Sequence, residues 1–173
     1  MSVLADPRLR RAALVAAVVL ALDQGTKALV QRTMRLHQSI RVTSFFDLTY
    51  LRNPGAAFSL FRDAPATIRL PLFLLVTVVV SAALVSYLRS TPVERTWTVV
   101  ALGAILGGAL GNLVCRVRYG EVVDFVYLHW GEWYWPAFNV ADSAISVGVA
   151  VVLLESLRGG GAQATEEPAT TAR

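Results

Sequence analysis

This chain of 173 residues has little of the chemistry on which many enzymes and binding proteins depend. It contains one cysteine, one lysine and two histidines, His37 and His129, which stand far apart. A lone cysteine excludes a disulfide within the chain and a cysteine-based metal cluster, and two distant histidines argue against a metal site. Only 16% of the residues are charged, and the arginines are scattered, so nucleic-acid binding has little support. We therefore expect no metal, cofactor or nucleic acid.

Apolar residues, in contrast, are abundant. They make up 55% of the chain, and the mean hydropathy is +0.53, which is typical of a membrane protein. Four stretches have the length of a membrane-spanning helix, and we place them at residues 12–30, 70–88, 96–115 and 136–157. The first also resembles the start of a secretory signal peptide, but its helical pattern continues without a convincing cleavage site, so we read it as a retained span.

The segments between the spans indicate structure outside the membrane. Residues 31–69 alternate apolar and polar side chains over much of their length, which predicts a small sheet. Residues 116–135 are rich in tryptophan and tyrosine, as at a membrane–water interface, and we expect a short surface helix or loop there. The fold class is thus a mainly α membrane protein with a small extracytoplasmic sheet.

These boundaries give one domain over residues 1–158 and a Gly/Ala/Thr/Glu-rich tail over residues 159–173, which we expect to be disordered. Four spans place both termini on one side of the membrane and the folded loops on the other. The arginines near the N-terminus favour a cytoplasmic N-terminus, but residues 31–69 carry six arginines of their own, so positive-inside counting does not settle the orientation.

The strongest functional signal is a carboxylate inside the fourth apolar stretch. Asp142 lies six residues after Pro136, a favourable first-turn residue, and so roughly 9 Å along the predicted helix. A charge within a span costs about 2.5–3.5 kcal/mol on insertion scales and usually marks a functional site. Asp124 is the nearest candidate partner, because two carboxylates brought together can share a proton and activate a water molecule. His129 is better explained as an interfacial ring than as a ligand or base.

Several other polar residues have both a functional and a plain structural interpretation. Asp23 and Lys27, at i and i+4, either anchor loops near the site or form a salt bridge at the membrane edge. Asn53 either binds an extended peptide or caps the turn at Pro54-Gly55. Asn112 and Arg116 either organise the site or, for the arginine, reach lipid phosphate. Glycines at 103, 107, 108 and 111 predict close packing of the third helix inside the bundle.

Taken together, five motifs resemble those of the bacterial lipoprotein signal peptidases, also called signal peptidase II. The resemblance covers about residues 12–157. Each motif is weak alone, but the five occur in order across the four spans. They are Asp23-Gln24-Gly25-Thr26-Lys27, Asn53-Pro54-Gly55-Ala56-Ala57-Phe58, Gly107-Gly108-Ala109-Leu110-Gly111-Asn112-Leu113-Val114-Cys115-Arg116, Val122-Val123-Asp124-Phe125 and Phe138-Asn139-Val140-Ala141-Asp142-Ser143.

The resemblance implies an intramembrane aspartic endopeptidase of the bacterial inner membrane. It would remove the signal peptide from diacylglyceryl-modified prolipoproteins by cleaving before the lipidated cysteine, without metal or cofactor. Prolipoproteins and membrane lipids would be its partners, and a monomer is expected. By the resemblance, the site residues are the catalytic Asp124 and Asp142, the substrate-binding or supporting Asn53, Gly108, Asn112, Arg116 and Asn139, and the structural Asp23 and Lys27.

One position departs from the family pattern. Cys115 stands where the family usually has aspartate, so a partner expected for Arg116 is missing. Two rival functions also stay open on the residues alone. A small transporter or proton channel would explain an aspartate on a polar helix face, although residues 147–154 are apolar. A non-catalytic assembly factor would use the glycine-rich helix as its interface, but it leaves Asp142 unexplained.

Overall fold

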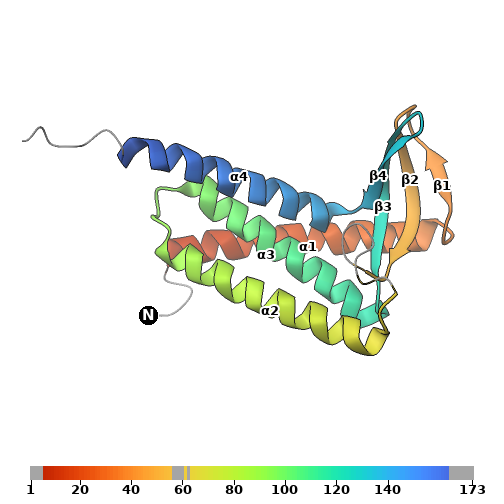
Figure 1. Ribbon diagram of the computed structural model, residues 1–173, viewed down its shortest axis with the longest axis horizontal. Helices are drawn as coiled ribbons and strands as arrows, with labels where there is room; N and C mark the ends of the chain where they lie inside the picture. The colour runs from red at the N-terminus through yellow and green to blue at the C-terminus, as the bar shows by residue number, and fades with distance from the viewer. Residues whose placement is uncertain (1–5, 56–60, 62, 164–173) are drawn as a thin grey trace, which may run out of the picture.

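Four long helices and a four-stranded sheet make up the part of the chain that the computed structural model describes, residues 6–55, 61 and 63–163 (Figure 1). The helices are α1 (Pro7–Thr33), α2 (Ala66–Ser90), α3 (Thr96–Tyr119) and α4 (Val140–Gln163). Each contains a stretch long and apolar enough to cross a membrane, so the four predicted spans are confirmed. The N-terminal end of α1 and the C-terminal end of α4 lie at the end of the bundle opposite the sheet.

The helix boundaries follow from local capping. The side chain of Asp6 accepts a hydrogen bond from the backbone N–H of Arg8 at 2.9 Å, and Pro7 opens α1. At the other end of the bundle, α3 stops at Gly120, whose φ of 74° is a left-handed conformation that glycine adopts without strain. The chain then turns directly into the sheet, which places this sheet at the end of α3.

The fourth helix begins later than predicted. We expected it to start at Pro136, but Pro136 lies in a strand and α4 begins at Val140. The reason is capping, because the side chain of Asn139 accepts from the backbone N–H of Asp142 at 3.0 Å. The helix also continues through the first residues of the predicted 159–173 tail, to Gln163; residues 164–173 lie outside the described part of the chain.

The sheet is an antiparallel meander. Its strands are β1 (Ser39–Arg41), β2 (Phe46–Asn53), β3 (Val122–Trp130) and β4 (Trp133–Phe138), in that spatial order. The predicted sheet within residues 31–69 is confirmed as β1 and β2. The surface helix or loop predicted for residues 116–135 is wrong, since most of this segment forms β3 and β4. Aromatic residues favour strands as well as interfaces, and Gly131, with a φ of 58°, allows the tight turn.

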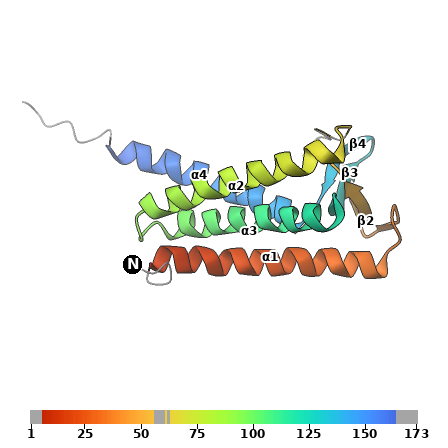
Figure 2. The same cartoon turned by 90° about the horizontal axis from the view of Figure 1, so that it is seen from below.

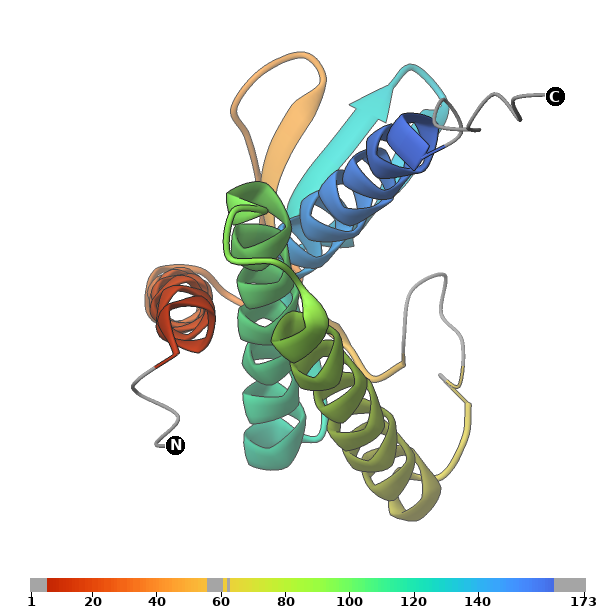
Figure 3. The same ribbon diagram turned by 90° about the vertical axis from the view of Figure 1, so that its left-hand side faces the viewer.

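Helix α3 is the central helix of the bundle. It packs against α1, α2 and α4, with α1 on one side and α2 and α4 diverging on the other (Figure 3), and Figure 2 shows α1 and α3 running alongside each other. Glycines make this packing possible. A Cβ on Gly107 would lie 2.6 Å from the carbonyl oxygen of Ala16 on α1, and one on Gly108 would lie 2.5 Å from that of Ala141 on α4.

A small apolar core fixes the sheet to the bundle. Val30 and Met34, at the end of α1, are buried with Tyr50 of β2 and with Val123 and Phe125 of β3. Because these contacts join the last turn of α1 to the two central strands, the position of β3 relative to the helices is set by packing. This matters for function, since β3 also carries Asp124.

Candidate active site

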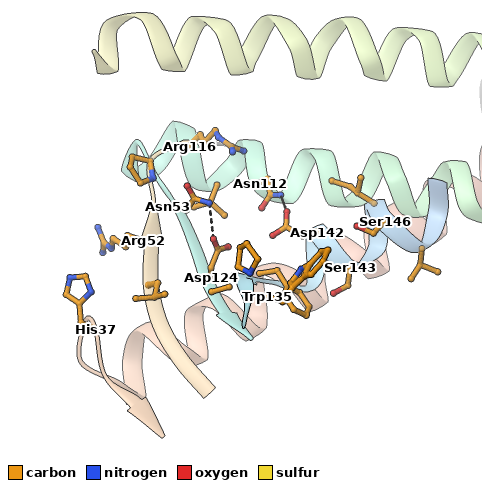
Figure 4. Close-up of a pocket in the computed structure, with 18 residues that line it drawn as sticks. His37, Arg52, Asn53, Asn112, Arg116, Asp124, Trp135, Asp142, Ser143 and Ser146 are labelled. Atoms are coloured by element: carbon orange, nitrogen blue, oxygen red, sulfur yellow. Dashed lines mark hydrogen bonds between the residues drawn. The ribbon is translucent and has the colours of Figure 1, made fainter. Parts of the chain in front are cut away.

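Two aspartates from different parts of the fold meet at one cavity. Asp124 lies on β3, and Asp142 lies in the first turn of α4. Both side chains line a cavity of about 820 Å³ between the sheet and the helix ends, as the close-up in Figure 4 shows. The structure therefore brings the two predicted carboxylates to one cavity, with Asp142 at the start of its helix rather than deeper along it.

Asn139 bridges the two carboxylates. Its Nδ2 donates to Asp124 Oδ1 at 2.6 Å, and its Oδ1 accepts from the backbone N–H of Asp142 at 3.0 Å. The Asp142 side chain in turn accepts from the backbone N–H of Asn139 at 3.2 Å. This reciprocal pair is a capping box, with the residue before the helix and the third helical residue satisfying each other. The start of α4 and the position of Asp142 are thus set by the same bonds.

Asp124 is buried, with 3% of its surface exposed. Burial, together with the negative charge of nearby Asp142, raises the pKa of Asp124 to about 7. Asn53 donates to its second oxygen from Nδ2 at 3.2 Å, while the Asn53 Oδ1 accepts from the backbone N–H of Gly55 at 3.0 Å. Asn53 therefore holds the turn, as its structural interpretation predicted, and it also contacts Asp124, while binding of a peptide by Asn53 stays a prediction. The later part of its motif, residues 56–58, lies outside the described residues.

Asp142 is held by a chain of side chains that runs back to α1. Asn112 of α3 donates from Nδ2 to Asp142 Oδ1 at 2.8 Å, and its own Oδ1 accepts from Lys27 Nζ at 2.9 Å. Lys27 also donates to Asp23 Oδ2 at 2.8 Å. Since Lys27 is only 1% exposed, the membrane-edge salt bridge with an exposed lysine is ruled out.

Arg116 lines the cavity and does not reach outward to lipid phosphate. Its guanidinium donates to the Gly55 carbonyl at 3.0 Å and lies over the ring of Phe73 on α2, 4.2 Å from the ring centre. The neighbouring Cys115 is buried on another side of α3, where Gln24 Nε2 lies 3.7 Å from its sulfur. The side chain that stands in the place of the usual family aspartate therefore faces α1, and Arg116 has partners of its own.

The predicted site residues divide into two groups. Asp124, Asp142, Asn53, Asn112 and Arg116 line the cavity. The others lie behind its wall and hold it, namely Gly108, Asn139, Asp23 and Lys27. Within the described residues, no group of three or more histidine, cysteine or carboxylate side chains is placed to hold a metal ion.

Many of the residues that line the cavity were not predicted from the sequence. His37 and Arg52 lie on the sheet side, and Trp135 and Phe138 come from β4. Ser143 and Ser146 continue the polar face of α4. The sequence already indicates this face, because Asn139, Asp142, Ser143 and Ser146 stand at i, i+3, i+4 and i+7. The place of Trp135 and Phe138 in the cavity wall depends on β4, which was not predicted.

Comparisons with known proteins find chains that are similar over most of this sequence. A family model described as signal peptidase (SPase) II matches residues 15–158. The lipoprotein signal peptidase of Geobacter sulfurreducens is 50% identical over 140 residues, which are 80% of this chain and 86% of that protein. That of Syntrophotalea carbinolica is 46% identical over 148 residues, or 85% and 91% of the two chains.

Solved structures show the same architecture. One, described as a bacterial membrane enzyme, aligns with a TM-score of 0.77 and 29% identity over 94% of both chains. A second structure with the same description has a TM-score of 0.75 and 31% identity, and the alignment covers 84% of this chain and 92% of that one.

Proposed function

This chain belongs to the signal peptidase II family, the lipoprotein signal peptidases, and we propose that it cleaves its substrates as an aspartic endopeptidase. It is a multi-pass membrane protease that removes the signal peptide from prolipoproteins. We propose that it cuts before the diacylglyceryl-modified cysteine. The observation that carries the aspartic mechanism is the pair formed by Asp124 and Asp142 on one cavity wall, bridged by Asn139.

The surroundings of the two carboxyls indicate which one acts as the base and which one acts as the acid. Asp142 accepts from Asn112 and from a backbone N–H, and it lies at a helix N-terminus, where the helix dipole favours negative charge. Asp124, with its pKa raised to about 7, still carries a proton in about half of the molecules at pH 7, unlike an ordinary aspartate. We therefore assign Asp142 as the base and Asp124 as the acid, although the two titrate as a pair.

The reaction then proceeds in two steps. Asp142 takes a proton from water as the water oxygen bonds to the scissile carbonyl carbon, and Asp124 gives its proton to the carbonyl oxygen. When the intermediate collapses, the C–N bond breaks and the leaving nitrogen takes the proton held by Asp142. Asp124 recovers a proton from the hydroxyl that becomes the new carboxyl group. Both side chains return to their starting states.

The shape of the cavity suits a lipidated substrate. Its wall follows α4 from Asp142 to Val147, and Val147 is 64% exposed, so this side faces outward from the bundle. We propose that the acyl chains lie along this side within the bilayer, while Asn53 and Arg116 contact the peptide near the scissile bond. The apolar side chains of Ile145 and Val147 on α4 and the polar side chains of Asn53 and Arg116 elsewhere on the wall support this arrangement.

An aromatic stripe on the sheet supports the placement in the membrane. Phe45, Trp130, Trp133 and Trp135 form a row with ring centres 5.7, 5.6 and 6.3 Å apart, and each is 43–54% exposed. Trp135 also lines the cavity. Such rings favour the membrane–water interface. We propose that the stripe lies at the extracytoplasmic surface of the bacterial inner membrane, with both termini cytoplasmic and the protein a monomer.

The test is cleavage of a diacylglyceryl-modified prolipoprotein peptide by the detergent-purified protein in the presence of a metal chelator. The wild type is compared with Asp124→Asn and Asp142→Asn, which keep the side-chain volume and remove the proton chemistry. Asp47→Asn is the matched control, because Asp47 lies on the same sheet but outside the cavity. We expect cleavage by the wild type and the control only. Cleavage by either active-site variant would refute the aspartate pair.

A further inference from the structure

A buried lysine behind the cavity contacts the amide that holds Asp142. Lys27 Nζ lies 2.9 Å from Asn112 Oδ1, and Asn112 Nδ2 lies 2.8 Å from Asp142 Oδ1. Lys27 does not line the cavity. Lys27 therefore acts on the reaction from a distance, either through the field of its charge or through Asn112. The charge partly offsets the rise in the pKa of Asp124 that burial and Asp142 cause, and Asn112 contacts both Lys27 and Asp142.

The direction of this effect follows from hydrogen-bond chemistry. An ammonium group can only donate, whereas an asparagine amide presents an acceptor on one side and a donor on the other. The side of Asn112 that faces Lys27 must therefore be its oxygen, which leaves the NH₂ group pointing at Asp142. If the amide turned over, its NH₂ group would face the ammonium, and its oxygen would face a carboxylate.

Within the described part of the chain, Lys27 makes the shortest contact to the Asn112 oxygen. Asn139 Nδ2 also approaches it, but at 3.4 Å, near the limit for a hydrogen bond. Asp23 in turn holds the lysine, and its other oxygen accepts from the backbone N–H of Ala141 at 3.0 Å. Gly111 makes room for this carboxylate, since a Cβ there would lie 2.5 Å from Asp23 Oδ2. The Asp23–Lys27 ion pair on α1 is thus connected to the first turn of α4 in two ways. Asp23 accepts from the Ala141 N–H, and Lys27 donates to Asn112, which donates to Asp142.

We propose that Lys27 is a positioning residue for the reaction. Its ammonium fixes the orientation of the Asn112 amide, and the amide holds the Asp142 carboxylate as an acceptor turned toward the water to be activated. This rests on the proposed function of Asp142. It adds to the structural role expected for Lys27, because it assigns to this residue an effect on the rate of the chemical step.

The experiment replaces the lysine without leaving a buried charge unpaired. Lys27→Met is made together with Asp23→Asn, because the asparagine retains an oxygen for the Ala141 N–H. The reference is the wild type, because Asp23→Asn alone would leave the buried ammonium of Lys27 unpaired. Relative to it, we expect kcat to fall by about 100-fold with KM unchanged, since loss of orientation near the reacting atoms affects the chemical step more than binding.

A second comparison tests whether the effect passes through Asn112. The same pair of chains is made in an Asn112→Ala background, where we expect the paired substitution to change kcat by less than about threefold. Arg8→Gln serves as a control for stability alone, because Arg8 donates to the carbonyls of Arg89 and Thr91 at the opposite end of the bundle. It should lower the melting temperature and leave kcat unchanged.

The outcomes separate this inference from the proposed function. Unchanged kcat in the folded Lys27→Met chain would refute it, and so would an equal loss of kcat in the Asn112→Ala background. If the paired variant does not fold, Lys27→Leu in the Asp23→Asn background, which likewise has no donor for the Asn112 oxygen, replaces it and is judged by the same two comparisons. Failure of the wild type itself to cleave would instead count against the proposed function.

Discussion

At the scale of single residues, the candidate site is built from amides that each serve two partners. Asn139 bonds both aspartates, Asn112 joins Asp142 to Lys27, and Asn53 joins Asp124 to the turn at Gly55. An asparagine amide is suited to this because it is neutral and offers both a donor and an acceptor. Among the residues that the structure describes, no positively charged group is in direct contact with either carboxyl.

The raised pKa of Asp124 predicts a dependence of stability on pH. The pKa is about 7 in the folded protein against 3.8 for an ordinary aspartate, so between these values the folded state binds a proton that the unfolded chain has lost. The favourable contribution of the protonated carboxyl is complete below pH 3.8 and is lost as the pH rises through 7. We expect Asp124→Asn to raise the melting temperature in detergent at pH 8 and to change it little at pH 4.

Loss of the proton from Asp124 also predicts that activity falls on the alkaline side of the pH profile. Because Asp124 acts as the acid, kcat/KM of the wild type should fall as the pH rises through about 7. Asp47→Asn should follow the wild-type profile, since Asp47 lies outside the cavity. An activity that is flat from pH 6 to pH 9 would contradict the assignment of Asp124 as the acid.

At the scale of elements, the close approach of α3 and α4 is what brings Asn112 to Asp142. Gly108 permits this approach, because a Cβ there would lie 2.5 Å from the backbone oxygen of Ala141. We expect Gly108→Ala to push back the start of α4 and to lower both the melting temperature and kcat. Backbone atoms cannot move aside as the end of a flexible side chain can, so the loss should be clear in thermal unfolding and in the cleavage assay.

Gly25 provides the matched control on α1. A Cβ on Gly25 would have no neighbour within 4 Å, and replacing a helical glycine by alanine is worth roughly 0.5–1 kcal/mol of stability. Gly25→Ala should therefore leave activity unchanged and raise the melting temperature slightly. If the two alanine variants behaved alike, helix propensity and not the close approach would explain the result at Gly108.

The elements also show how far the sequence could be interpreted alone. The four spans and the pairing of Asp124 with Asp142 were predictable, because apolar length and an isolated carboxylate in a span are strong signals. The strands β3 and β4 were missed because Trp130, Trp133 and Trp135 suit both an interface and a strand. The start of α4 was misplaced because proline suits a first turn, although the spacing of Asn139 and Asp142 already matched a capping box.

At the scale of the whole molecule, the aromatic stripe and the helix bundle together predict how deeply the sheet sits. Trp133 lies within the stripe, whereas Trp97 is exposed at the opposite end of the bundle. The measurement uses vesicles in which the sheet side of the protein faces outward. A quencher confined to the headgroup region of the outer leaflet should then quench a chain whose only tryptophan is Trp133. A chain whose only tryptophan is Trp97 should not be quenched. Equal quenching of the two chains would contradict the proposed placement.

The division of the aspartate pair between β3 and α4 has a consequence for how the protein is made. Helices α1 to α3 and strand β3 all precede α4 in the chain, so Asp142 leaves the ribosome after nearly everything that it must meet. A chain that stops before α4 has Asp124 and the sheet but lacks both the second carboxylate and the Asn139 that bridges the pair. Hydrolysis by the aspartate pair therefore requires synthesis to have passed the start of α4, and chains that stop before it lack the pair.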